Sequence, residues 1–289
     1  MSGLSVMVVS SNNSIQESQA DRIAPWLSLL ETTAQTVSLV IPAYDEEMCI
    51  GRSLREVMNC VAAYPAFREV IVVDDGSTDR TAAIVEDCRK EHTAARAHLI
   101  LLRHERNQGK GAAVRTGLSH AAGDIVAFTD ADLSSPMSEL PALLGPILAG
   151  ECDIVIGSRA LDRSLIATRQ SRFRETAGKI FNVLVRLLTG LPIYDTQCGF
   201  KAFRRNAIAP ILRLQRVETF AFDVEMLYLA SRMGLTIREI PVHWSHVSHT
   251  KVKLFRDSIR MFLDVLIVRL NALRGRYRQT DQQTDRPTD

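Results

Sequence analysis

The sequence has few of the features that mark secreted, zinc-binding or membrane-spanning proteins. Its five cysteines are scattered and form no CxxC pair, which argues against a disulfide framework or a zinc site and favours reduced thiols. No apolar run approaches the ~20 residues of a membrane span, and residues 1–10 are too short and too weakly flanked for a signal peptide. We therefore expect a cytoplasmic location, which leaves room for a helix lying on a membrane surface.

Charge imbalance and two nucleotide-binding signatures are also missing. The 35 basic and 33 acidic residues leave a net charge of +2, so the overall charge gives no sign of nucleic acid and we expect no such partner. Neither a GxxxxGK[ST] loop nor a GxGxxG after a strand occurs, which disfavours P-loop and dinucleotide-binding proteins. With 46% hydrophobic residues, the 289-residue chain has the composition of a globular protein with a sizeable core.

Short apolar runs alternate with helical patterns from Val37 onward. The runs predict five strands, at residues 37–41, 70–73, 99–102, 125–128 and 153–157. Buried strands separated by helices predict an α/β fold whose mostly parallel sheet is flanked by helices on both faces. In such sheets ligands bind beyond the carboxyl ends of the strands.

Each unusual polar cluster in this half of the chain follows one of those strands. The clusters are Tyr44 to Glu46, Asp74 to Asp79, Asn107 to Gly111, Asp130 to Ser134, and Ser158-Arg159. Because the carboxyl ends of parallel strands share one edge of the sheet, we expect these clusters to build one site there.

The Asp130-Ala131-Asp132 motif ends the strand at 125–128 and has two interpretations. The pair can form a turn and a helix cap. If the chain stays extended, residues i and i+2 point to the same side, and two converging carboxylates suit a hard divalent cation held also by a phosphate. The other polar clusters at the same edge favour the metal site.

Arginines at the same edge indicate a phosphate ligand, because the guanidinium fork matches phosphate oxygens. Arg159 and the arginines of 169–174 are the candidates, although both are also compatible with a solvated surface. Asp75 either belongs to a turn or accepts a hydrogen bond from a nucleobase. We do not expect a metal site at His243, His246 and His249, and we interpret Cys198 as a packing residue.

The second half of the chain predicts three helices, a strand and a compact loop. Helices are expected at 171–188, 222–233 and 254–273, a strand at 236–242, and a polar loop at 195–201. The helix at 254–273 has one apolar side and arginines nearby, and it is either a core helix or an amphipathic interfacial helix near anionic lipid. We divide the chain into a flexible arm (1–36, with a short helix near 24–30), a catalytic domain (37–245), an acceptor and membrane-interface segment (246–278) and a disordered tail (279–289).

Four motifs in order resemble the inverting family 2 glycosyltransferases. They are Val37 to Tyr44, Val73 to Asp79, Asn107 to Gly111, and Asp130-Ala131-Asp132. The resemblance covers residues 37 to 273. Within that family, Asp195 to Lys201 and Arg256 to Arg260 resemble the members that transfer sugar to dolichyl or polyprenyl phosphate.

The resemblance implies a GT-A type nucleotide-sugar-binding fold and a role for each motif residue. It implies that the nucleobase and ribose contact Pro42, Tyr44, Glu46, Val73 and Asp75. It implies that Mg²⁺ or Mn²⁺ and the diphosphate contact Asp130, Ala131, Asp132 and Ser134, with Asp132 as the better direct ligand. The implied cationic contacts to the donor or acceptor phosphates are Lys110, Arg159, Lys201, Lys251 and one of Arg172 and Arg174. The implied catalytic residues are Asp132, Arg159 and Arg174.

The resemblance also implies a reaction: transfer of glucose from UDP-glucose to a dolichyl or polyprenyl phosphate, with inversion, by a protein peripheral to the cytoplasmic face of a membrane. A GDP-mannose donor and a hydroxyl acceptor are the alternatives. Two departures from the family pattern stand out, namely Asp45 in place of asparagine and His249-Thr250-Lys251 in place of Gly-Ser-Lys. A nucleotidyltransferase is disfavoured because Pro42 to Glu47 contains no glycine. The sequence does not indicate an oligomeric state.

Overall fold

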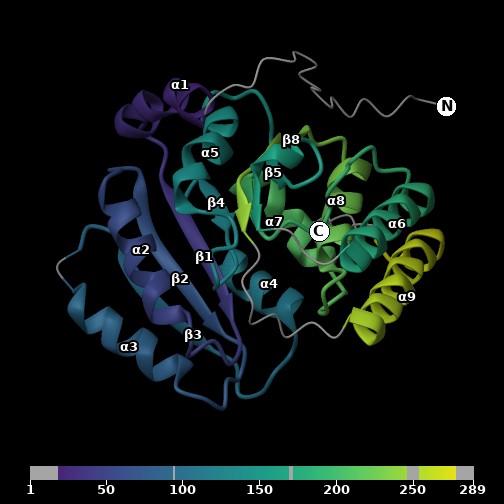
Figure 1. Cartoon of the computed structure of the whole chain (residues 1–289), viewed down its shortest axis with the longest axis horizontal. Coiled ribbons are helices and arrows are strands. Elements are labelled where there is room, and N and C mark those ends of the chain that lie inside the picture. The colour runs from purple at the N-terminus through teal and green to yellow at the C-terminus, as the bar shows by residue number, and fades with distance from the viewer. Residues whose placement is uncertain (1–18, 94, 169–171, 246–253, 278–289) are drawn as a thin grey trace, which may run out of the picture.

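The computed structural model describes residues 19–93, 95–168, 172–245 and 254–277, with only the backbone described at 172–177, 179 and 254–259. These residues form a sheet of seven strands in the order β3-β2-β1-β4-β7-β5-β8 (Figure 1). The strands are β1 (Val37–Ala43), β2 (Phe67–Asp74), β3 (His98–Arg103), β4 (Ile125–Phe128), β5 (Ile154–Ser158), β7 (Lys201–Arg204) and β8 (Ile237–Pro241). The five strands expected in the first half are confirmed to within a few residues.

Helices cover both faces of the sheet, as the apolar strands require. Alternate side chains of β1 enter two different cores: Leu39 and Ile41 pack with α2 and α5, whereas Val40 packs with α4, α7 and α8. The helices are α2 (Ile50–Ala62), α3 (Thr81–Glu91), α4 (Lys110–His120), α5 (Leu140–Leu148), α7 (Arg205–Leu214) and α8 (Phe222–Arg232). Two single-turn 3-10 helices are η1 (Met137–Glu139) and η2 (Arg163–Leu165), and β6 (Ile166–Thr168) pairs with β9 (Trp244–Ser245).

Strand β7 was not expected. It lies between β4 and β5 and runs antiparallel to both, with Lys201 opposite Phe128 on one side and Ile156 on the other. The start of an antiparallel strand lies at the edge where its parallel neighbours end. The polar loop was predicted at 195–201, but Lys201 begins β7, and residues 195–200 are brought to the carboxyl edge of the sheet, beside the Asp130 turn.

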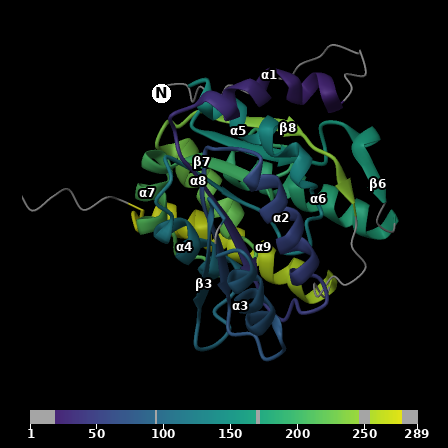
Figure 2. The ribbon, with the colours of Figure 1, turned by 90° about the vertical axis from the view of Figure 1, so that its left-hand side faces the viewer.

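Part of the predicted flexible arm is a packed helix. Helix α1 (Gln19–Thr32) is longer than the helix expected at 24–30, buries Ile23 and Leu30, and lies along α5 (Figure 2). Arg22 Nη2 lies 3.1 Å from Glu139 Oε1, and its Nη1 donates to the carbonyl of Pro241. Residues 1–18 and the tail at 279–289 lie outside the described residues.

Helices α6 (Arg172–Thr189) and α9 (Leu254–Leu273) lie side by side (Figure 1), at the positions expected for them. Phe181 and Val185 of α6 and Val265 of α9 form a small core with Val224 of α8. Within the part of the chain that the structure describes, no helix is long and apolar enough to cross a bilayer.

Candidate active site

The turn after β4 brings Asp130 and Asp132 to one cavity, although the chain does not stay extended there. Leu133 N donates to the Asp130 carbonyl at 3.1 Å, and Ser134 N donates to Asp132 Oδ1 at 3.0 Å. Leu133 has a φ of +50°, which closes the turn. The two interpretations of the motif are thus compatible, because the turn itself places both carboxylates at the same cavity.

This cavity of about 620 Å³ lies beyond the carboxyl ends of β1, β2 and β4. Eight of the predicted site residues line it, namely Pro42, Tyr44, Glu46, Asp75, Lys110, Asp130, Ala131 and Asp132. Its wall also includes Cys49 and the residues of the loop from Asn107 to Gly109. The shared edge inferred from the sequence is therefore the location of a cavity that is rich in polar side chains.

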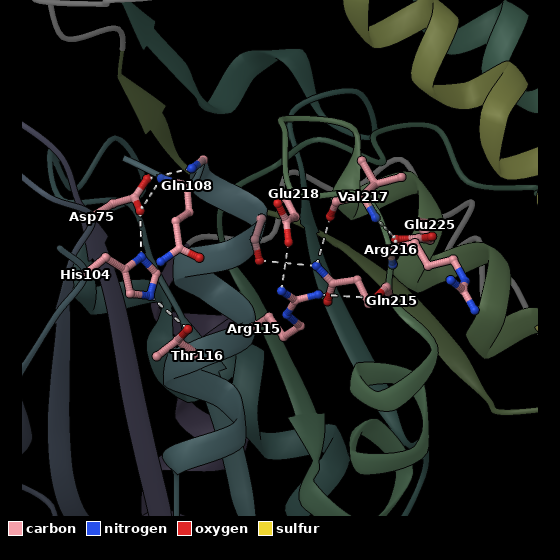
Figure 3. Close-up of polar contacts among 12 residues, drawn as sticks. Asp75, His104, Gln108, Arg115, Thr116, Gln215, Arg216, Val217, Glu218 and Glu225 are labelled. Carbon is pink, nitrogen blue, oxygen red and sulfur yellow. Dashed lines mark hydrogen bonds and ion pairs between the residues drawn. The ribbon is translucent and has the colours of Figure 1, made fainter. Parts of the chain in front are cut away.

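Asp75 anchors the glycine-rich loop rather than projecting freely into the cavity. Its carboxylate is 2% exposed and accepts hydrogen bonds from Gln108 N at 2.9 Å and Gly109 N at 2.8 Å. His104 Nδ1 lies 2.7 Å from the same carboxylate, and His104 Nε2 lies 3.0 Å from the Thr116 hydroxyl, as Figure 3 shows. The carboxylate thereby fixes the loop that leads into Lys110.

Lys110 neutralises Asp130. Its Nζ lies 2.5 Å from Asp130 Oδ1, and although burial acts in the opposite direction, Asp130 and Asp223 raise the pKa of Lys110. The lysine is placed by Gly109, which has a φ of +104° and on which a Cβ would overlap the Glu218 carbonyl. Gly111 N donates to that same carbonyl at 2.8 Å.

Of the two carboxylates, Asp130 and Asp132, the charge of Asp132 is the less well compensated. Burial and the neighbouring Asp130 raise its pKa above the ordinary value, although Ser134 and Lys110 act to lower it. A cation beside it would relieve this repulsion. Asp132 is therefore better suited to a cation than Asp130, which already has Lys110 as its partner.

The carboxylates of Asp130 and Asp132 fit a hard divalent ion whose remaining ligands are not protein side chains. Carboxylate oxygens suit Mg²⁺ or Mn²⁺, which keep several waters or phosphate oxygens when bound. No group of three His, Cys, Asp or Glu side chains able to hold an ion occurs in the described ranges. Asp132, with Asp130 beside it, would hold the ion, and a diphosphate and water would complete its coordination.

Gly199 belongs to the site and was missed by the sequence analysis. A Cβ on Gly199 would overlap the carboxylate of Asp130, so only glycine allows loop 195–200 to approach this side chain. The signal was present in the Asp195 to Lys201 motif, but nothing local links that motif to Asp130. The contact depends on the antiparallel β7.

Arg159 is held by the carboxylate of Asp195. Its Nε and Nη2 donate to the two oxygens of Asp195 at 2.7 and 2.8 Å, and its guanidinium lies 5.5 Å from the Trp244 ring centroid. Burial acts to raise the pKa of Asp195, but Arg159 holds it below the ordinary value. Glu239 accepts from the backbone N–H groups of Tyr194 and Asp195. Arg159 does not line the cavity itself; burial acts to lower its pKa, but its partner Asp195 raises it, with a smaller contribution from Asp130.

Two predicted site residues are buried in the core. Lys201 is 1% exposed, and its Nζ contacts Asp223 Oδ1 and the Cys198 carbonyl, each at 2.5 Å. The predicted phosphate contact of Lys201 is therefore wrong for this structure, because the charge is already satisfied by Asp223. Val73 is fully buried in the sheet core and does not line the cavity. Burial raises the pKa of the Cys198 thiol to about 11, in agreement with a packing role.

The remaining predicted residues have these positions. Ser134 is 9% exposed and its amide holds Asp132, but it does not line the cavity. Arg172 and Arg174 lie in the first turn of α6, where only the backbone is described, and Lys251 lies outside the described residues, as do His246 and His249. His243 Nδ1 contacts Glu139 Oε1. Asp45, where the family pattern has asparagine, has a φ of +49° and accepts from Thr78 N at 2.8 Å.

Helix α9 supplies a wall of the cavity that the sequence did not predict. Arg260, Met261 and Asp264 line it, together with Thr219 and Phe220 of the loop before α8. Thr219 Oγ1 donates to Asp264 Oδ2 at 2.5 Å. The C-terminal helix is thus part of the same cavity as Asp130 and Asp132.

Comparison with known proteins shows the family to which the chain belongs. The chain is 35% identical over 258 residues to the dolichyl-phosphate β-glucosyltransferase of Saccharomyces cerevisiae, covering 84% of this chain and 76% of the yeast protein. It is 34% identical to the human protein of the same name, covering 87% of this chain and 80% of the human one.

Solved structures show the same fold. Glucosyl-3-phosphoglycerate synthase from Mycobacterium tuberculosis, in complex with Mn²⁺, UDP and phosphoglyceric acid, aligns with a TM-score of 0.62 and 22% identity over 96% of this chain and 88% of that one. The same enzyme with Mg²⁺ and UDP gives a TM-score of 0.60 at 23% identity, covering 88% of this chain and 84% of that one. The expected GT-A fold is confirmed. The model of glycosyl transferase family 2 matches residues 38–212. The chain, whose carboxylate pair lies at the same sheet edge as its glycine-rich loop, is therefore a member of glycosyl transferase family 2.

Proposed function

We propose that this protein transfers glucose from UDP-glucose to a dolichyl or polyprenyl phosphate, with inversion at the anomeric carbon. The cavity lined by Asp75, Lys110, Asp130 and Asp132 carries the proposal, because it joins a nucleotide-sized space to a pair of carboxylates suited to a metal diphosphate. Relatives at 31–36% identity that are named dolichyl-phosphate β-glucosyltransferase support the sugar and the acceptor.

The chemistry is a single displacement. An oxygen of the lipid phosphate attacks the anomeric carbon of glucose, the bond from that carbon to the diphosphate oxygen breaks, and UDP leaves with the bonding electron pair. Because the acceptor is already an anion, no strong general base is required. A divalent ion would stabilise the negative charge that develops on the leaving diphosphate.

The described residues have distinct parts in this reaction. Asp132 would hold the metal diphosphate, and Asp130 is kept in place by Lys110 and by the close approach of Gly199. Arg159, fixed by Asp195, remains our candidate from the family resemblance for a contact with the diphosphate or the acceptor phosphate. Arg174 remains our candidate for the acceptor phosphate from the family resemblance.

We further propose that α6 and α9 rest on the membrane that holds the acceptor. The two adjacent helices expose eight large apolar side chains, which are Ile180, Val183, Leu184, Leu187, Leu263, Ile267, Leu270 and Leu273. Leu187 and Leu273 are each 77% exposed. Apolar side chains gathered on neighbouring helices suit the interface of a bilayer. Since α9 also lines the cavity, this contact would bring the site to the lipid phosphate.

A donor panel tests the function. Radiolabelled UDP-glucose, UDP-N-acetylglucosamine and GDP-mannose are each offered with a polyprenyl phosphate and Mg²⁺ or Mn²⁺, and label is counted in the organic phase. We expect label from UDP-glucose alone, and only with the divalent ion. Asp132→Ala should abolish transfer while the fold survives. Wild-type turnover in that variant would refute the mechanism, and label from GDP-mannose alone would refute the sugar.

A further inference from the structure

The cavity is strongly acidic for a site that would take an anionic ligand. Its charged lining residues are Glu46, Asp75, Lys110, Asp130, Asp132, Arg260 and Asp264. Carboxylates therefore outnumber cations, and the cations are only Lys110 and Arg260 among the lining residues described. The divalent ion proposed above would offset part of this acidity for a diphosphate, and phosphate oxygens that the ion does not bind would need a cation that is not already paired.

The positive charge of Lys110 is already paired, because its ammonium lies 2.5 Å from Asp130 Oδ1. Arg260 differs. Its side chain is exposed, and across the described ranges no ion pair or side-chain hydrogen bond joins it to another residue, including Asp264 one turn further along α9. Asp264 is instead engaged by the Thr219 hydroxyl.

The turn of α9 that bears Arg260 is held at two points. Gln197 Nε2 contacts Met261 Sδ at 3.1 Å, and Thr219 Oγ1 contacts Asp264 Oδ2 at 2.5 Å. Gln197 belongs to the loop that approaches Asp130, and Thr219 follows Glu218, whose carbonyl holds the start of α4. The α9 backbone at Arg260 is therefore held in place from two sides of the cavity. This limits the conformational entropy that the protein loses when Arg260 binds a ligand.

We propose that Arg260 is a phosphate-binding residue of this site, which rests on the function proposed above and adds α9 to the binding machinery. A guanidinium offers two parallel N–H donors to two phosphate oxygens, and its charge offsets the repulsion between the ligand and the cavity carboxylates. The phosphate belongs either to the donor diphosphate or to the acceptor lipid, and the two sources are separable by experiment.

Two binding measurements on the full chain test the proposal without relying on transfer. UDP binding in the presence of Mn²⁺ is followed by calorimetry, and binding of a short-chain polyprenyl phosphate is followed in nonionic detergent micelles. Arg260→Ala should weaken one of the two by about tenfold or more, the size expected for a charge-assisted hydrogen bond. Arg260→Lys keeps the charge but not the fork, so it should recover only part of the affinity.

Arg213→Ala is the matched control, because Arg213 is an exposed arginine on α7 that does not line the cavity. It should leave both affinities within about twofold of wild type. Weaker UDP binding assigns Arg260 to the donor diphosphate, and weaker lipid-phosphate binding at unchanged UDP affinity assigns it to the acceptor. If Arg260→Ala leaves both affinities at wild-type values with an unchanged melting temperature, the proposal is overturned. A wild-type protein that transfers no sugar yet binds UDP through Arg260 would refute the proposed reaction and not this residue.

Discussion

Tyr277 donates a hydrogen bond of 2.6 Å to Oε1 of Glu225, and the other oxygen of this carboxylate accepts from the backbone N–H groups of Arg216 and Val217. Figure 3 shows Glu225 beside the segment from Gln215 to Glu218. Glu218 in turn holds the start of α4 through Gly111. The segment that follows α9 is thus connected through one buried carboxylate to the loop that carries Lys110.

Tyr277→Phe should destabilise the fold. Burial raises the pKa of Glu225, so its ionised form depends on the donors around it, and losing a hydrogen bond to a charged group costs about 1.5–3 kcal/mol. A carboxyl whose folded-state pKa is raised loses stability as the pH increases through that pKa. The variant raises the pKa further, so its deficit in unfolding free energy should be largest at neutral pH and shrink as the pH falls. Urea unfolding at several pH values measures this.

Tyr194→Phe serves as the control for that experiment, because Tyr194 is 45% exposed. Its loss of a hydroxyl should change the unfolding free energy by less than about 0.5 kcal/mol. Equal deficits in the two variants, or a Tyr277→Phe deficit that does not vary with pH, would contradict the role assigned to Glu225.

Gly199→Ala should impair catalysis more than folding. The new methyl group would displace the Asp130 carboxylate, and a shift of about 1 Å at a site that positions substrate can reduce the rate by ~100-fold. The measurement is steady-state transfer together with the melting temperature. Gly178→Ala in α6 meets open space, so it should keep full activity and gain about 0.5–1 kcal/mol of stability. Normal transfer by Gly199→Ala would show that the Asp130 position does not matter.

Asp132→Asn should stabilise the metal-free protein and remove its response to metal. Burial and Asp130 raise the pKa of Asp132, so this group favours the folded state below the unfolded-state value of 3.8 and loses that contribution as the pH rises. Asparagine keeps the acceptor for Ser134 N without the charge. The melting temperature at pH 7 should therefore increase relative to wild type, and this gain should shrink as the pH falls towards 4.

Asp132→Asn also distinguishes the effect of charge repulsion on the melting temperature from the effect of metal binding. Mn²⁺ with UDP should raise the melting temperature of wild type, because a ligand that binds only the folded state stabilises it. Asp132→Asn should lose that increase, whereas Asp162→Asn, at a carboxylate held by Ser164 away from the cavity, should retain it. An undiminished increase in Asp132→Asn would exclude Asp132 as the principal ligand.

The sequence predicted the parts of the site that follow local patterns. Apolar runs mark parallel strands, and polar residues after them mark the ligand edge, so these patterns are enough to place Asp75, Lys110 and Asp132 at one site. Lys201 was assigned wrongly because a lysine after a polar loop looks the same whether it faces a ligand or a buried Asp223. Arg260 was missed as a cavity residue because a charge on the polar side of an amphipathic helix usually faces water.

The contact between Gly199 and Asp130 could not be predicted from the sequence for a related reason. It depends on β7, which is only four residues long and lies antiparallel between β4 and β5. Its position is fixed by partners more than 40 residues away in the chain, as Lys201 pairs with both Phe128 and Ile156. Strands of this kind carry little periodicity, and tertiary pairing decides where they lie.

Membrane contact through α6 and α9 predicts that charged substitutions on this face weaken vesicle binding. Leu187→Glu and Leu273→Glu each place a carboxylate at a side chain that is 77% exposed, so the fold should tolerate them. Burying one leucine is worth about 1.5–3 kcal/mol, so each variant should lose roughly tenfold or more in partitioning onto phosphatidylglycerol vesicles, measured by co-sedimentation. Met48→Glu introduces the same carboxylate at an equally exposed apolar residue on the cavity wall. This variant should bind vesicles like wild type. If all three variants sediment equally, this face does not contact the bilayer, and the acceptor must reach the cavity by another route.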